Sequence, residues 1–120
     1  MGGGFDLFST MYVAYFRELG ERLRPLALTL LQKIQDGTAG DVPTWGYKLL
    51  ACAPNDSVNQ LAGSLSSADL VTRERATVAL GYMGPAAFPA QAKLQAALAA
   101  APTDREKRLL DWALREIAVD

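Results

Sequence analysis

Residues 67–101 read SADLVTRERATVALGYMGPAAFPAQAKLQAALAAA, and they predict two amphipathic helices joined at Met83-Gly84-Pro85. The apolar residues of the first helix recur at steps of three and four, which places them on one face. They are Leu70, Ala76, Ala79, Leu80 and Met83. Gly84 suits the positive φ angle that ends a helix, and Pro85 fits the first turn of the next one. A helical hairpin of this kind is the repeat unit of an α-solenoid.

The same pattern recurs elsewhere in the chain. A shift of 34 positions places Leu80 on Leu114, and a shift of 64 places Gly84 on Gly20. We therefore predict an all-α fold, a right-handed α-α superhelix with about seven helices. The chain would be a single domain over 1–120, with repeats over 6–36, 42–66 and 67–101 and a half repeat over 102–120.

The first repeat is predicted to contain two helices, with a break between Gly20 and Pro25. The shift of 64 places four residues of its first helix on core positions. They are Tyr12, Tyr15, Phe16 and Leu19. Leu26 belongs to the apolar set of the second helix. The middle repeat fits the pattern least well, and we expect Trp45 and Tyr47 to fill its part of the core, with a ligand contact as the alternative.

The start of the last helix is clearly signalled. Thr103 and Glu106 have the spacing of a capping box, in which each side chain satisfies the other residue's free backbone amide. The charges that follow alternate in sign, which is typical of a solvated helix face. They are Lys107, Arg108, Asp111, Arg115 and Glu116.

Charge and hydropathy restrict the classes of partner. The chain has 120 residues, half of them hydrophobic, with 12 basic and 13 acidic residues and a net charge of −1. The basic residues are spread along the chain, so nothing indicates a nucleic-acid partner. No apolar run approaches the ~20 residues that a membrane span needs.

The reactive residue types are scarce. A single cysteine excludes an internal disulfide, and the absence of histidine removes the commonest general base and metal ligand. We therefore expect no catalytic residues, no metal site and a location in the reducing cytoplasm.

The chain resembles HEAT-repeat proteins, of the HEAT/armadillo-like solenoid class, in Asp69-Leu70-Val71-Thr72-Arg73, Ala76, Ala79-Leu80-Gly81 and Met83-Gly84-Pro85. More narrowly, it is similar to the short HEAT-like repeats of the phycobilin (phycobilisome) lyase-type family. The match is good over 67–117, fair over 8–34 and weak over 42–66.

The resemblance implies a binding function, because HEAT arrays mostly bind other proteins. We expect a non-enzymatic protein–protein interaction module or adaptor without a cofactor, whose partner is a phycobiliprotein or another photosynthetic light-harvesting complex. The alternative is a phycobilin chromophore lyase, or its partner subunit, with a bilin in its groove. We favour the first, because without histidine an acid–base role would rest on scattered carboxylates. A protein that recognises damaged DNA is disfavoured by the lack of clustered Lys and Arg.

We expect the partner, or a second copy of the chain in a homo-oligomer, at the two ends of the solenoid. An uncapped repeat leaves apolar surface open. The predicted partner-binding residues are Phe5, Leu7, Phe8 and Met11 at the N-terminus and Leu109 and Trp112 at the C-terminus. Two alternatives remain. These side chains could fold back over the terminal helices, or the interface could form on the polar side that carries Gln60, Gln91, Lys93 and Gln95.

Overall fold

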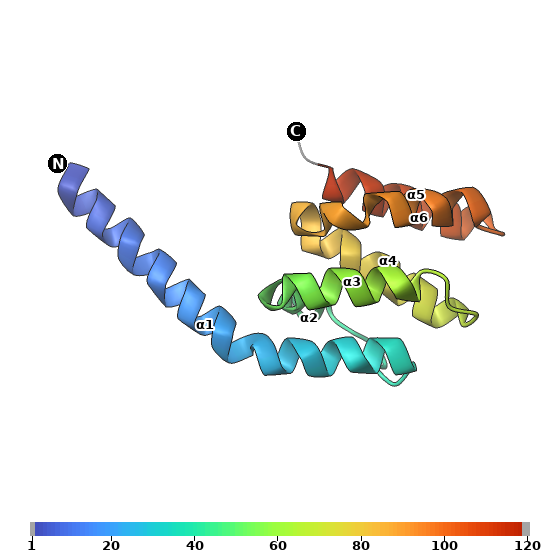
Figure 1. The fold of residues 1–120 in the computed structure, drawn as a ribbon, viewed down its shortest axis with the longest axis horizontal. Coiled ribbons are helices and arrows are strands. Elements are labelled where there is room, and N and C mark those ends of the chain that lie inside the picture. Colours follow the sequence, from blue (N-terminus) through green and yellow to red (C-terminus); the bar gives the residue numbers. More distant parts are fainter. Residues whose placement is uncertain (1, 119–120) are drawn as a thin grey trace.

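The computed structural model describes the backbone of residues 2–118 and the side chains of residues 18–118, and its described regular elements are all helices (Figure 1). The all-α prediction is therefore confirmed. Where we predict about seven helices, the described residues form six α-helices and two 3₁₀ helices. Their bounds are α1 (Gly2–Asp36), α2 (Thr44–Leu49), η1 (Leu50–Cys52), α3 (Pro54–Ser64), α4 (Leu70–Met83), η2 (Gly84–Ala90), α5 (Gln91–Ala100) and α6 (Asp104–Ile117).

The N-terminal segment is one long helix, so the predicted break between Gly20 and Pro25 is wrong. Helix α1 continues through both residues and bends along its length (Figure 1). The residues around Gly20 are mostly Leu, Glu and Arg, which favour a helix, and an ion pair of 3.1 Å joins Glu18 to Arg22 across the glycine. Proline inside a helix removes one hydrogen bond and crowds the preceding turn, which bends a helix that its neighbours support.

Only the later part of α1 joins the body of the molecule, and the first half projects away from the other helices (Figure 1). Ala27, Leu31 and Ile34 are buried on this later part. Leu19 is 36% exposed and Leu26 57% exposed, so neither is a core residue. The other predicted core residues of this repeat, at positions 12, 15 and 16, lie outside the described side chains. Although α1 has 35 residues, neither it nor any other described helix is apolar enough to cross a membrane.

The core lies among the later part of α1, the short helices after it, and α3 to α6. On α4 the predicted stripe is confirmed at four of its five positions, with Leu70 as the exposed exception. On α6 the shift of 34 is confirmed at Leu110, Ala113 and Ile117, which are buried, whereas Leu114 is half-buried. Glu106 is the one other buried residue of this helix. These two helices are therefore built on the same pattern of inward side chains.

The two aromatic residues of α2 have different environments. Tyr47 is 7% exposed and belongs to the core, as predicted, whereas Trp45 is 72% exposed. Side chains two positions apart on an α-helix, such as these two, point about 200° apart. A helix as short as α2 therefore turns only one of them toward the core. The prediction that Trp45 fills the core is wrong for this reason.

The hinge after α4 is confirmed as a glycine-dependent turn. Gly84 has φ 65° and ψ −146°, a conformation that residues with a side chain rarely adopt. The segment that follows is the 3₁₀ helix η2, which contains Pro85 and Pro89, and α5 begins only at Gln91. Ala87 and Ala90 are the buried residues of η2, three positions apart, which is one turn of a 3₁₀ helix, and Phe88 between them is 40% exposed.

Helices α4 and α6 approach closely at Gly81. A Cβ atom at this position would overlap the six-membered ring of Trp112, so the indole lies directly on the backbone of α4. The edge of Trp112 also meets the ring of Tyr82, with 5.2 Å between centroids, and Tyr82 stacks on Tyr47 at 5.9 Å. One row of three aromatic rings thus connects α2, α4 and α6.

Gly81→Ala should destabilise the protein by about 2 kcal/mol, because the added methyl group overpacks the contact with Trp112. In a Trp112→Ala background the same change should stabilise by up to about 1 kcal/mol, since Ala favours a helix more than Gly does. Urea-induced unfolding of the wild type, the two single variants and the double variant measures both effects. An equal effect of Gly81→Ala in the two backgrounds would contradict the proposed contact.

Candidate functional site

Two hollows adjoin each other over α4 and α6, and both are lined by Glu74 and Leu109. The first, which we call the alanine cleft, has a volume of about 510 Å³ and lies among α3, α4, α5 and α6. The second, which we call the arginine groove, has a volume of about 470 Å³ and lies among α2, α4 and α6. Because they meet, a ligand can extend from one hollow into the other.

A large part of the wall of the alanine cleft is apolar and consists of small side chains and leucines. Alanines of α5 form one side, and leucines that follow α3 or lie on α6 form the others. These wall residues are Ala96, Ala97, Ala100, Leu65, Leu109 and Leu110. The alanine-rich sequence of α5 therefore leaves this space unfilled.

The start of α4 places Arg73 in this cleft. Asp69 caps the helix, and its carboxylate accepts hydrogen bonds from the backbone amide of Thr72 at 3.3 Å and from its hydroxyl at 2.8 Å. The hydroxyl bond is the main cause that lowers the pKa of Asp69 below its ordinary value. Arg73 follows one turn later, and its Nη1 donates to the carbonyl oxygens of Ser67 at 2.9 Å and Ala68 at 3.2 Å.

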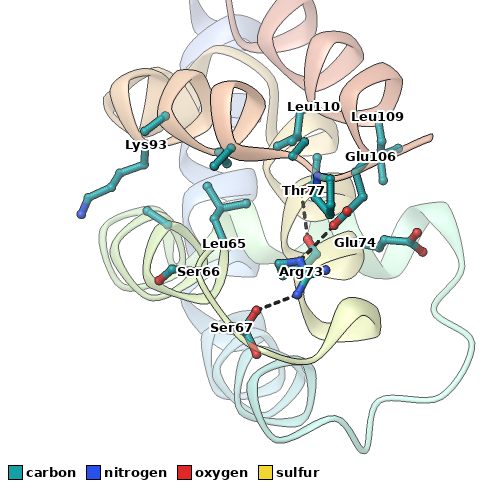
Figure 2. A pocket seen from close by; sticks show the side chains of 16 residues that line it. Leu65, Ser66, Ser67, Arg73, Glu74, Thr77, Lys93, Glu106, Leu109 and Leu110 are labelled. Carbon is teal, nitrogen blue, oxygen red and sulfur yellow. Dashed lines mark hydrogen bonds and ion pairs between the residues drawn. The ribbon is translucent and has the colours of Figure 1, made fainter. Parts of the chain in front are cut away.

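Arg73 also joins α4 to α6 through an ion pair with Glu106. The Nε of Arg73 donates to Oε1 of Glu106 at 2.9 Å, and Figure 2 shows both side chains meeting at one side of the cleft, with Lys93 at the other. Glu106 is only 6% exposed, and its Oε2 has no hydrogen-bond partner among the described residues. The negative charge of this buried carboxylate is thus balanced by one guanidinium group.

The capping box at the start of α6 is half confirmed. The Oγ1 of Thr103 accepts a hydrogen bond from the amide of Glu106 at 3.2 Å, as predicted. The side chain of Glu106 faces Arg73 instead of returning to the amide of Thr103. The half-buried guanidinium of Arg73 offers a stronger, charge-assisted hydrogen bond than a backbone amide does.

The arginine groove gathers three guanidinium groups from two helices that are far apart in the sequence. Arg75 comes from α4, and Arg105 and Arg108 come from α6. Arg105 pairs with Glu74, with 3.3 Å between Nε and Oε1. Within the part of the chain whose side chains are described, Arg75 and Arg108 form no ion pair. The scattered positive charge inferred from the sequence is therefore concentrated locally by the fold.

Aromatic rings form the rest of this groove. Trp112 and Tyr47 line it together with Val78. Burial is the main cause that raises the pKa of the Tyr47 phenol above its ordinary value of 10.0, and the nearby Arg75 opposes this effect. The phenol is therefore neutral near pH 7, and it does not offset the positive charge of the groove.

The structure places the two predicted C-terminal site residues on these hollows. Leu109 is half-buried and lies where they meet, and the half-buried Trp112 packs on α4 with one part of its ring system and lines the arginine groove with another. Phe5, Leu7, Phe8 and Met11 lie outside the described side chains. Of the four residues on the predicted polar side, Lys93 alone lines one of the two hollows, within residues 18–118.

The sequence contained one signal for the arginine groove. The shift of 34 that aligns α4 with α6 places Arg75 on Leu109, directly beside Arg108. What the sequence does not provide is the lateral distance between the two helices, which depends on the contact of Trp112 with Gly81.

The comparisons do not assign a function to these hollows. No family model, curated protein or solved structure matches the chain. In the region that the structure describes, no group of three or more Cys, Asp and Glu side chains could hold a metal ion. The function is therefore argued from the residues of the two hollows.

Arg73→Met should destabilise the protein by about 3 kcal/mol, because it leaves the carboxylate of Glu106 buried without a cation. The double variant Arg73→Met/Glu106→Leu should recover most of this loss, since it removes the buried charge as well. Urea-induced unfolding measures both changes.

The exposed ion pair between the same two helices is the matched control. Arg105→Met breaks the pair with Glu74 and should cost less than about 1 kcal/mol, because exposed ion pairs contribute little. If Arg73→Met lowers the free energy of unfolding by no more than Arg105→Met does, the ion pair of Arg73 with Glu106 does not compensate a buried charge.

Proposed function

We propose that the protein is a non-enzymatic binding module that holds a partner protein over the surface of α4 and α6. The observation that supports this most is that an apolar cleft and a basic groove adjoin there and share Glu74 and Leu109. Protein interfaces combine apolar side chains with Trp and Arg at their energetic centres, and all three kinds occur on this surface.

The polar groups of the alanine cleft favour binding over catalysis. Glu106 is 6% exposed and tied to Arg73, so a substrate has little access to its carboxylate. The hydroxyl of Thr77 donates to the backbone carbonyl of Arg73 at 2.9 Å, which leaves its proton engaged with the helix and not with a base. A nucleophile or general base needs both access and an activating neighbour, and these residues lack one or the other.

The packing of the helices supports a short solenoid as the framework. In chain order, α3 packs on α4, α4 on α6 and α5 on α6, and the later part of α1 packs on η1 and α3. Neighbour-to-neighbour packing of this kind is what a repeat array uses. We propose this solenoid class, of the HEAT/armadillo-like type, on the combination of that packing with the shared pattern of α4 and α6.

The resemblance to phycobilin lyase-type repeats makes a phycobiliprotein the first partner to test. Under this proposal the protein acts as an adaptor and holds no bilin of its own. A tightly held bilin, visible in the absorption spectrum of the protein purified from a bilin-producing host, would instead favour the chromophore lyase.

Ala100→Trp should abolish partner binding by filling the alanine cleft, because Ala100 lines it. Ala99→Trp is the matched control, since Ala99 is an exposed neighbour on α5 that lines neither hollow. Biotinylated wild type and both variants are incubated with a native cell extract and with purified phycobiliprotein, and the retained proteins are identified by mass spectrometry.

The expected result is a set of proteins retained by the wild type and by Ala99→Trp but lost with Ala100→Trp. Circular dichroism confirms that the three proteins are equally folded. If all three retain the same proteins in the same amounts, the cleft does not take part in binding and the proposal fails.

A further inference from the structure

We infer that the arginine groove binds an acidic segment of the partner protein, whose carboxylates engage Arg75 and Arg108 while an adjacent aliphatic side chain enters the alanine cleft. This inference rests on the proposed binding function and specifies the chemistry of the partner. It combines the charge of one hollow, the apolar wall of the other, and their shared border.

The charge of the groove selects an anionic ligand. Three guanidinium groups and one carboxylate line it, on a chain whose overall net charge is −1. Because Glu74 compensates Arg105, the charges available for a partner are those of Arg75 and Arg108. A local excess of positive charge on a slightly acidic protein attracts acidic segments and disfavours basic ones.

The chemistry of the groove fits carboxylates. A guanidinium group binds a carboxylate through two parallel hydrogen bonds, and the half-buried position of Arg75 strengthens such a contact. The ring of Trp112 provides apolar surface beside the charges, which the methylene groups of Glu side chains can cover. A nucleic acid is disfavoured, because phosphate backbones require an extended basic surface and this groove also contains Glu74.

The border between the hollows can admit a continuous chain. Leu109 lines both hollows, so a segment that crosses from one to the other passes over an apolar side chain. The pair of Arg105 with Glu74 stands at the same border, and its arginine side chain is 78% exposed. Such a pair contributes little stability, so a carboxylate of the partner can compete for Arg105 without disrupting the fold.

The test uses two synthetic peptides and the two tryptophans of the chain as reporters. The probe is acetyl-Glu-Glu-Leu-Leu-Glu-Glu-amide, and its charge-reversed counterpart contains Lys in place of Glu. Each is titrated into ¹⁵N-labelled protein while the indole N–H signals are recorded. Trp112 lines the groove, whereas Trp45 is 72% exposed and lines neither hollow, so it serves as an internal control. A Trp45→Phe variant assigns the two signals.

The acidic peptide should move the signal of Trp112 and leave that of Trp45 in place, and the basic peptide should move neither. Arg108→Ala should weaken the binding of the acidic peptide about tenfold, the effect of losing a charge-assisted hydrogen bond. Arg115→Ala is the matched control, because Arg115 is also exposed on α6 but lines neither hollow. The two variants change the net charge equally, so only a local contact distinguishes them.

Three results would overturn the inference. They are an equal response to both peptides, an equal loss of affinity in Arg108→Ala and Arg115→Ala, and a response of Trp112 to a single-stranded oligonucleotide but not to the acidic peptide. The last result would assign the groove to nucleic acid.

The pull-down separates this inference from the proposed function. If Ala100→Trp loses the partner while Arg108→Ala retains it, the proposed binding function is supported, and the inference that the groove binds an acidic segment fails. If neither variant loses the partner, both fail.

Discussion

The contact of Trp112 with the backbone of α4 at Gly81 sets how closely α4 and α6 approach, and both hollows depend on that approach. With a larger residue at position 81, the indole would be displaced, and the row formed with Tyr82 and Tyr47 would separate. The same indole also forms part of the arginine groove. The packing that stabilises the fold and the surface available to a partner therefore share one side chain.

The ion pair of Arg73 with Glu106 joins the same two helices near their N-terminal ends. Unlike the aromatic contact, the ion pair stabilises the fold only while both charged side chains are present. Apolar packing, in contrast, loses stability gradually with each atom that is removed. Arg73 also holds the turn before α4 through two backbone carbonyls. Its charge is thus fully engaged within the protein, which leaves the arginines of the neighbouring groove as the ones that can recognise a ligand.

The sequence predicted those features of the fold that follow from helical periodicity. The buried faces of α4 and α6 were predictable, because both helices carry the same spacing of apolar residues, and the positive φ angle of Gly84 followed from the Gly-Pro pair. The break predicted between Gly20 and Pro25 is absent, because strong helix formers on both sides outweigh one glycine and one proline. The arginine groove was missed because its members lie off the apolar stripe and meet only through tertiary packing. Of the predicted site, Leu109 and Trp112 lie on the hollows for which function is proposed.

The alanine wall of the cleft has a consequence for the entropy of binding. An alanine side chain has no rotamers to lose, whereas an ordered Arg side chain loses about 1.5–2 kcal/mol of conformational freedom. A ligand that covers Ala96, Ala97 and Ala100 meets a surface that is already in its bound shape. A ligand that engages Arg108 must first immobilise an exposed, flexible side chain. The rigid alanine cleft therefore favours affinity, because little conformational entropy is lost when it binds. The arginine groove is adaptable and tolerates variation in the sequence of its ligand.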